Sequence, residues 1–367
     1  MSENEKRRSG RRRIGGWRPA AAVLIGMLVA VSVPTTATAI GSWSTPSLVY
    51  TPTSVQTTGY SYAPDLIPGT TNRMWSCHSR TSGTVRDDIF ETKLNGATLV
   101  SSASVLSGTG TGWDSFHNCD PSVVAVNATI AGTAFSYAMF YTGNDADCSC
   151  HNQIGVAFAT SLDGPWTKYP SPVIAFDPAQ PTTQWGAGQP SATSVDPAAG
   201  TVVLTWTSGY TSTPSDSKGN FAQISFATGA PVVSSRHQIQ TTGLTDSTGA
   251  ADYLNNFDIA YSPTRDVFFL IREAHPYPTS NPNYISSSVQ VDSISGSAMW
   301  SGTGNWTVLS SIGSGVTGYA RTHNPGFART VYGTLPDESK LTALVTTSTL
   351  DPNSLWSYRV WSTTATL

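Results

Sequence analysis

The sequence predicts an all-β fold, a five-bladed β-propeller whose ring is closed by pairing of the N- and C-terminal strands. A polar or carboxylate-bearing signature, followed by an apolar strand, a turn and an aromatic-rich strand, recurs at intervals of 55 to 69 residues. Self-similarity at such a long period is typical of repeat architectures. Short strands separated by Gly-rich turns favour a propeller among them. The signatures are Ala63–Ile67, Cys119–Val123, Gly188–Ala192, Asn256–Ala260 and His323–Phe327.

Each signature is expected to open an inner strand, with further strands following it outward. Blade one is predicted at 65–67, 73–79, 88–93 and 98–106, and blade two at 120–126, 135–142, 153–160 and 166–174. Blade three is predicted at 191–195, 201–208, 221–228 and 231–239, and blade four at 257–261, 267–272, 286–293 and 306–311. Alternation of apolar and polar residues along these segments indicates antiparallel strands.

Blade five has only three strands of its own in the sequence, near 324–329, 341–348 and 355–363. Ser47–Thr51, which precedes blade one, is the predicted source of its outer strand. Closing the ring with the opposite terminus removes two exposed sheet edges. No composition break divides residues 40–367, so a single propeller domain is expected there.

Residues 1–39 are predicted to be an export signal peptide. They hold seven Lys or Arg and two Glu, then the apolar run Ala20–Val33, and they end on the small-x-small site Ala37–Ala39. The apolar run is too short to span a bilayer comfortably. We therefore expect a secreted, extracellular protein that has no membrane contact after signal cleavage.

Charge and composition narrow the class of partner. Without residues 1–39 the chain has 13 basic and 21 acidic residues, a net charge of −8. An acidic surface argues against nucleic acid or an anionic membrane as partner. Few charges and ten Trp after residue 39 fit a protein that handles neutral, polar ligands such as sugars. We expect a carbohydrate substrate and a monomer.

The cysteines are Cys77, Cys119, Cys148 and Cys150. Export makes disulfides the default expectation. A bridge between Cys148 and Cys150 would be strained, so each is expected to pair with Cys77 or Cys119 and tie blade one to blade two. The alternative is a metal site, because His78 and His151 adjoin cysteines.

Several motifs resemble those of the five-bladed glycoside hydrolases of family 43 and their arabinanase, xylosidase and invertase-like relatives. The resemblance rests on Tyr62–Asp65, on Asp120–Val123 followed by Met139–Gly143, and on Ile154–Ala157 running into Ser161–Trp166. Blades one and two carry it, and the later blades match mainly in rhythm. The resemblance implies that Asp65 acts as base or nucleophile and that Asp120 tunes pKa values and orients the sugar.

The general acid is the difficulty in this resemblance. The relatives offer a Glu at the head of the blade-three inner strand, where this chain has Gln189, and an amide cannot give up a proton. Glu273 closes the second strand of blade four and should therefore reach the mouth at which the inner strands begin. Glu91 lies in mid-strand and Glu338 in a turn at the opposite end. Glu273 is therefore the predicted acid.

Further residues are predicted to contact the substrate. Trp113 and Trp185 lie in Gly-rich loops before a blade head, where aromatic rings stack on sugars. Arg321 and His323 precede the last inner strand and can bind hydroxyl groups. The full set is Asp88, Trp113, Trp185, Gln189, Asp258, Arg321 and His323, and Asp88 and Asp258 are reserve candidates for the acid.

Structural roles compete with these assignments. Asp65 and Asp120, each beside a proline, could instead satisfy backbone amides at strand ends, and Glu273 could form a surface ion pair with Arg272 or a neighbour. Trp113 could fill a gap between blades, as aromatic side chains often do.

The predicted function is that of a secreted glycoside hydrolase that cleaves a pentose or furanose linkage with a carboxylate pair in the propeller funnel. The alternative is a carbohydrate-binding propeller that lacks the general acid, and Gln189 favours this hypothesis. A third hypothesis is a structural or protein-binding propeller. No cofactor is required and no metal ligand is assigned. Resemblance to relatives with a central calcium implies that His323 touches a cation or water in the axial channel.

Overall fold

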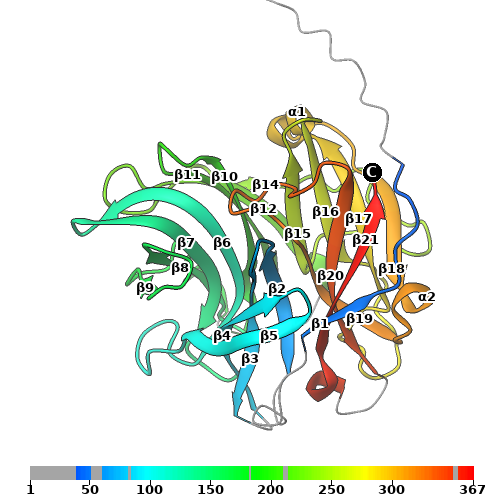
Figure 1. Cartoon of the computed structure of the whole chain (residues 1–367), viewed down its shortest axis with the longest axis horizontal. Coiled ribbons are helices and arrows are strands. Elements are labelled where there is room, and N and C mark those ends of the chain that lie inside the picture. The colour runs from blue at the N-terminus through cyan, green and yellow to red at the C-terminus, as the bar shows by residue number, and fades with distance from the viewer. Residues whose placement is uncertain (1–38, 51–59, 82–83, 182, 210–213, 350–353) are drawn as a thin grey trace, which may run out of the picture. The chain divides into compact units, whose positions relative to one another are not determined.

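The computed structural model describes residues 39–50, 60–81, 84–181, 183–209, 214–349 and 354–367. Five antiparallel sheets are arranged around a ring, which confirms the predicted five-bladed β-propeller (Figure 1). Four sheets have four strands and the third blade has five. Apart from its last residue, the predicted export signal lies outside the described residues.

The strands of blades one, two and four run outward from the axis in chain order, whereas the last strand of blade three pairs with the third, and the outer strand of blade five comes from the segment before blade one. Blade one contains β2 (Ser61–Ile67), β3 (Asn72–Thr81), β4 (Thr84–Asn95) and β5 (Thr98–Leu106). Blade two contains β6 (His117–Ile130), β7 (Thr133–Asn144), β8 (Gln153–Ala159) and β9 (Thr167–Lys168). Blade three contains β10 (Gly186–Asp196), β11 (Thr201–Gly209), β12 (Lys218–Ser225), β13 (Val232–Val233) and β14 (His237–Gln238).

Blade four contains β15 (Phe257–Ser262), β16 (Val267–Glu273), β17 (Ser288–Ser295) and β18 (Thr307–Gly313). Blade five contains β19 (Arg321–Phe327), β20 (Lys340–Ser348), β21 (Arg359–Thr366) and β1 (Ser47–Tyr50). The helices are α1 (Gly296–Ser301) and α2 (Ser314–Thr317), with 3-10 turns at Pro214–Asp216 and Ser354–Ser357. Among the described residues, no helix has the length and apolar character needed to cross a membrane.

Ring closure follows the sequence prediction. β1 pairs antiparallel with β21, and Leu48 lies opposite Trp361. In Figure 1 the blue β1 and the red β21 share the blade-five sheet. The predicted strand Ser47–Thr51 is thus confirmed over Ser47–Tyr50, and Thr51 lies outside the described residues.

The hydrophobic core is divided among the interfaces between neighbouring blades. Alternate residues of one strand face opposite interfaces: Phe268 and Leu270 of β16 pack with blade three, whereas Phe269 and Ile271 pack with blade five. Both faces of an inner sheet are therefore buried, which explains why β16 is apolar at nearly every position up to Arg272. This packing holds the inner strands in a ring and places their N-terminal ends side by side.

The disulfides differ from the prediction. Cys77 of β3 is bonded to Cys119 of β6, so blades one and two are tied together as expected. The predicted pairing of Cys148 and Cys150 with those residues is wrong, because they are bonded to each other. Ser149 has φ of +45°, and this turn brings the two Cα atoms to 5.0 Å. A metal site that includes cysteine would need free thiolates, and all the cysteines are in disulfides.

Candidate active site

Near the N-terminal end of each inner strand, which we call its head, one residue lies in the left-handed region of φ. These residues are Ala63, Asp120, Gln189, Asn256 and Asn324, with φ between 37° and 55°. Residues other than Gly rarely adopt this conformation, and such strained positions cluster at functional sites. All five line a small cavity on the propeller axis. They are therefore equivalent positions, one in each blade.

This equivalence corrects the alignment of the two predicted carboxylates. The ladder register shifts between Tyr62 and Asp65 in blade one and between Cys119 and Ser122 in blade two. Asp65 is thus equivalent to Ser122, and the position equivalent to Asp120 is occupied by Ala63. Asp65 and Asp120 lie at different depths along the axis and do not form a matched pair.

A pocket of about 390 Å³ opens above the axial cavity. Four of the predicted residues line it: Asp120, Trp185, Gln189 and His323. Sequence reasoning missed several polar residues that share it, among them Tyr62, His117, Asn144, Asn152, Asn256 and Asn324. The side chains of a ring of blade heads converge here, so this pocket is the candidate active site.

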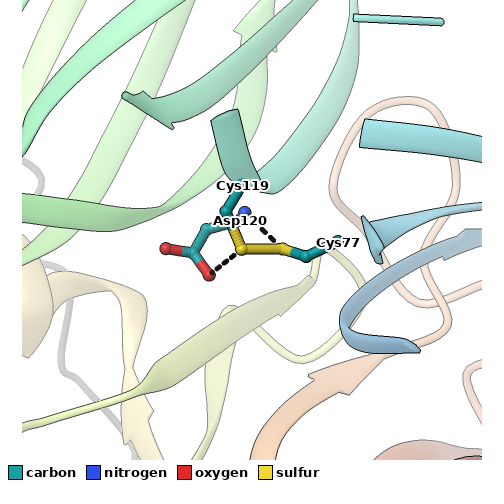
Figure 2. Close-up of side chains that lie close together, drawn as sticks. All are labelled: Cys77, Cys119 and Asp120. Atoms are coloured by element: carbon teal, nitrogen blue, oxygen red, sulfur yellow. Dashed lines mark hydrogen bonds between the residues drawn. A yellow bond between two sulfur atoms is a disulfide. The ribbon is translucent and has the colours of Figure 1, made fainter. Parts of the chain in front are cut away.

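Asp120 is the only carboxylate among the five head residues. Burial raises the pKa of Asp120, and hydrogen bonding to Thr142 and the charge of His117 offset part of that rise. Its backbone N–H donates to Cys77 Sγ at 2.9 Å, and Figure 2 shows the Cys77–Cys119 disulfide beside its carboxylate. The disulfide therefore fixes the position of Asp120. Both sulfur atoms of the disulfide are bonded to each other, so neither is a thiolate that could bind a metal ion.

Glu273 and His323 form a buried pair at the same mouth. His323 Nδ1 is in ion-pair contact with Glu273 Oε1, and the side chain of His323 is 13% exposed whereas that of Glu273 is fully buried. Asn256 Nδ2 donates to Glu273 Oε1 at 2.8 Å, and the Tyr277 hydroxyl donates to Oε2. Burial raises the pKa of Glu273, but the His323 charge and these hydrogen bonds outweigh burial and lower it. Glu273 is thus held ionised, with His323 between it and the pocket.

Asp87 and His117 form a second pair at this end, between blades one and two. Asp87 Oδ2 lies 3.5 Å from His117 Nδ1 and accepts a hydrogen bond of 2.6 Å from the Tyr62 hydroxyl, while Oδ1 accepts one of 2.6 Å from Tyr60. Burial raises the pKa of Asp87 despite His117 and the two tyrosines. Asp87 is fully buried, so His117 and Tyr62 are the members that reach the pocket.

Deeper along the axis, Asp65 and Asp258 enclose the guanidinium of Arg329. Arg329 Nη2 lies 3.0 Å from Asp65 Oδ1, and Nη1 lies 3.1 Å from Asp258 Oδ1. Arg329 also donates to the hydroxyls of Ser122 and Ser191 at 3.0 and 2.9 Å. Asp65 Oδ2 accepts from the Val123 N–H at 2.7 Å, and Asp65 is 3% exposed. This geometry supports a structural role for Asp65 more than the base role predicted for it.

The calcium ion that the family resemblance implied does not fit this channel. Calcium needs about six to eight oxygen ligands. The carboxylates that line the axial cavity below Asp120 are Asp65 and Asp258, and both are paired with the single guanidinium of Arg329. A divalent cation there would meet a fixed positive charge. His323, the residue proposed to touch it, is paired with Glu273.

Besides Asp258, which lines the axial cavity, three predicted contacts lie away from the pocket. Trp113 stacks on Tyr141 at 5.7 Å between ring centroids and packs against the core between blades one and two. Arg321 is buried and donates to the backbone oxygens of Ser280 and Pro282. Asp88 is also buried and does not line the pocket. The alternative of an ion pair between Glu273 and Arg272 is wrong, because Arg272 pairs with Asp252 and Asp292, and Glu273 pairs instead with His323.

Solved structures of similar fold are glycoside hydrolases. A thermostable family-43 glycoside hydrolase is 15% identical with a TM-score of 0.53, over 83% of this chain and 89% of that chain. This chain has the five-bladed fold of these proteins. An α-L-arabinofuranosidase from Podospora anserina, solved with cellotriose, is 10% identical with a TM-score of 0.58, over 89% of this chain and 97% of its own.

An endo-arabinase from Bacteroides thetaiotaomicron is 11% identical with a TM-score of 0.54, over 88% of this chain and 96% of its own. No family model matches the chain, and no curated protein matches its sequence. At these identities the likeness shows the fold, and the chemistry has to be argued from the site.

Proposed function

We propose that this chain is a secreted glycoside hydrolase that cleaves a pentose or furanose linkage in a polysaccharide or oligosaccharide. The polar pocket at the blade heads and the fold shared with an arabinofuranosidase and an endo-arabinase support this proposal. A basic, apolar leader and two disulfides support export, because disulfides persist in oxidising compartments.

Hydrolysis of a glycosidic bond needs a proton donor for the leaving oxygen and a carboxylate that activates the attacking group. Asp120 supplies the carboxylate in our proposal, because it is the only acid at a blade head and it lines the pocket. Burial raises the pKa of Asp120, and its side chain is ionised at any pH above that raised pKa.

His323 supplies the proton. Glu273, the acid predicted from sequence, has no exposed surface, engages both oxygens in hydrogen bonds or an ion pair, and has a lowered pKa. It therefore holds no proton to give at working pH. The ion-pair contact between Glu273 Oε1 and His323 Nδ1 positions the imidazole at the pocket. His323 then delivers the proton to the glycosidic oxygen, and water restores it.

One observation carries this proposal: Asp120 and His323 line the same pocket, from blades two and five, which are the two neighbours of blade one. A sugar ring over Ala63 would lie between them. Ala63 presents only a methyl group at this head position, which leaves room for the ring.

The test compares leaving groups. His323→Ala should lose at least about a hundredfold in kcat/KM on an arabinan or xylan oligosaccharide, because general acid catalysis contributes about 10²–10⁴. On a dinitrophenyl glycoside, whose leaving group needs no proton, its rate should stay within severalfold of the wild type. Equal losses on both substrates would show that His323 is not the proton donor.

A second candidate function is carbohydrate binding without hydrolysis. Ala63 and Gln189 occupy two of the five head positions and cannot exchange a proton, which favours this alternative. It predicts that the wild-type protein retains oligosaccharides on a glycan array and releases no reducing sugar after long incubation.

A further inference from the structure

A second hollow lies on the same face of the propeller as the candidate active site. Its volume is about 260 Å³, and it is lined by the first three strands of blade three, at Ala187, Ser208 and Lys218 among others, and by residues between 174 and 184. Ala187, Ser208 and Lys218 come from the start of β10, the end of β11 and the start of β12. Because antiparallel neighbours reverse direction, all three points lie at the mouth end of the blade. We call this hollow the blade-three groove.

The segment Gln184–Gly186 forms a partition between the groove and the active-site pocket. Trp185 lines the pocket, whereas its neighbours Gln184 and Gly186 line the groove. The partition is fixed by backbone hydrogen bonds to blade two, from Asn152 N to Trp185 O and from Ala187 N to Asn152 O, both 2.9 Å. Gly186 has φ of +90°, and a Cβ there would lie 2.3 Å from Asn152 O. Glycine is required for this close approach.

The lining offers both hydrogen-bond donors and acceptors. Lys218 and Arg236 line the groove, and neither forms an ion pair within the described part of the chain. Asp216 is an acceptor there. Asn220 Nδ2 donates to Ser208 Oγ at 2.9 Å, which orients the amide and leaves its oxygen to accept. Sugar hydroxyls both donate and accept, so a mixed lining suits a polyhydroxylated ligand better than a simple cation or anion.

We infer that the blade-three groove is a distal subsite for the same saccharide chain that occupies the active-site pocket. The groove is slightly smaller than the about 300 Å³ at which pockets for drug-sized ligands begin, so it fits a single sugar unit of a longer chain. The chain crosses the partition at Trp185 and extends outward over blade three. This inference rests on the proposed function, and it makes the preferred substrate a polymer or a long oligosaccharide.

The test measures binding as a function of chain length. The double variant Gln184→Ala/Lys218→Ala removes two groove contacts without touching the active-site pocket. Its matched control is Gln223→Ala/Lys340→Ala, which removes the same residue types at sites that line neither hollow. Dissociation constants are measured by calorimetry for the disaccharide and the hexasaccharide of the arabinan and xylan series, together with the hydrolysis rate of the disaccharide.

The groove variant should bind the hexasaccharide about tenfold more weakly than the wild type, since two hydrogen-bonding groups are lost. Its affinity for the disaccharide and the rate of disaccharide cleavage should match those of the control. Equal hexasaccharide affinity in the groove variant, control and wild type would overturn the subsite and leave the proposed function standing. Failure of the wild type to bind any member of either series would overturn both.

Discussion

Arg329 and Asp65 form an ion pair of 3.0 Å on the propeller axis, with both side chains 3% exposed. Asp258 completes the arrangement from blade four, so one guanidinium from the segment after β19 joins carboxylates of blades one and four. A buried cation requires compensating charge and hydrogen bonds. Arg329 therefore takes the place at the hub that a bound cation would otherwise fill.

This arrangement predicts how Asp65 and Arg329 respond to substitution. Arg329→Met leaves the buried Asp65 and the partly buried Asp258 without a counter-charge and should cost about 3–5 kcal/mol of unfolding free energy. Asp65→Asn should lower the unfolding free energy but retain hydrolysis in the fraction that is folded. Denaturant unfolding and sugar release measure both effects. Complete loss of hydrolysis in a stably folded Asp65→Asn protein would return Asp65 to the catalytic role predicted from sequence.

The Glu273–His323 contact predicts a positioning role for Glu273. Glu273→Gln removes the carboxylate that contacts His323 Nδ1, so kcat/KM should fall more on an oligosaccharide than on a dinitrophenyl glycoside, whose leaving group needs no proton. The acid limb of the pH–rate profile, which reports Asp120, should stay in place, above the ordinary Asp pKa of 3.8 because burial raises the pKa of Asp120. Equal losses on both substrates would exclude a role for Glu273 in positioning the proton donor.

The Cys77–Cys119 disulfide is expected to support both stability and activity. Replacing Cys77 and Cys119 with Ala removes a link between blades across 42 positions and should cost about 2–4 kcal/mol of unfolding free energy. It should also reduce hydrolysis, because the Asp120 N–H contacts Cys77 Sγ. Replacing Cys148 and Cys150 is a control for stability only, because that bridge closes a loop of two positions but Cys148 lines the pocket. Rates measured against the wild type at a temperature where both proteins are folded check the prediction; equal rates would show that the Cys77–Cys119 bond does not position Asp120.

Arg272 is paired with two buried carboxylates, Asp252 and Asp292, and burial raises the pKa of Asp292 to about 6 despite the charge of Arg272. A folded-state pKa above the unfolded value stabilises the protein below the unfolded pKa, and that contribution is lost as pH rises through about 6. Asp292→Asn should therefore flatten the dependence of unfolding free energy on pH between about 4 and 6. Parallel curves for variant and wild type would rule out titration of Asp292 in this range.

Much of the fold could be predicted because it depends on local patterns. Alternation and turn residues mark the strands, and the absence of an outer strand in blade five leads to β1. The alignment of Asp65 with Asp120 could not be obtained from the acids alone, because a register shift follows each head residue. The informative signal was the proline after the head residue, present as Pro64 and Pro121 and in two later blades.

The parts of the site that sequence reasoning missed depend on long-range contacts. Arg329 follows a strand with no local feature that marks it as a hub, and its partner Asp65 is 264 positions away. The role of Glu273 changed for a similar reason. Its place at the end of β16 was predicted correctly, but its contact with His323 joins blades four and five and cannot be read from either segment.

The most direct measurement of the central claim is hydrolysis by Asp120→Asn, with oligosaccharide binding and thermal unfolding recorded on the same preparation. The substitution keeps the shape of the side chain and removes its charge. Sugar release should fall by at least about a hundredfold, while the dissociation constant and the melting temperature stay close to those of the wild type. An undiminished rate of sugar release from the folded variant would contradict the account.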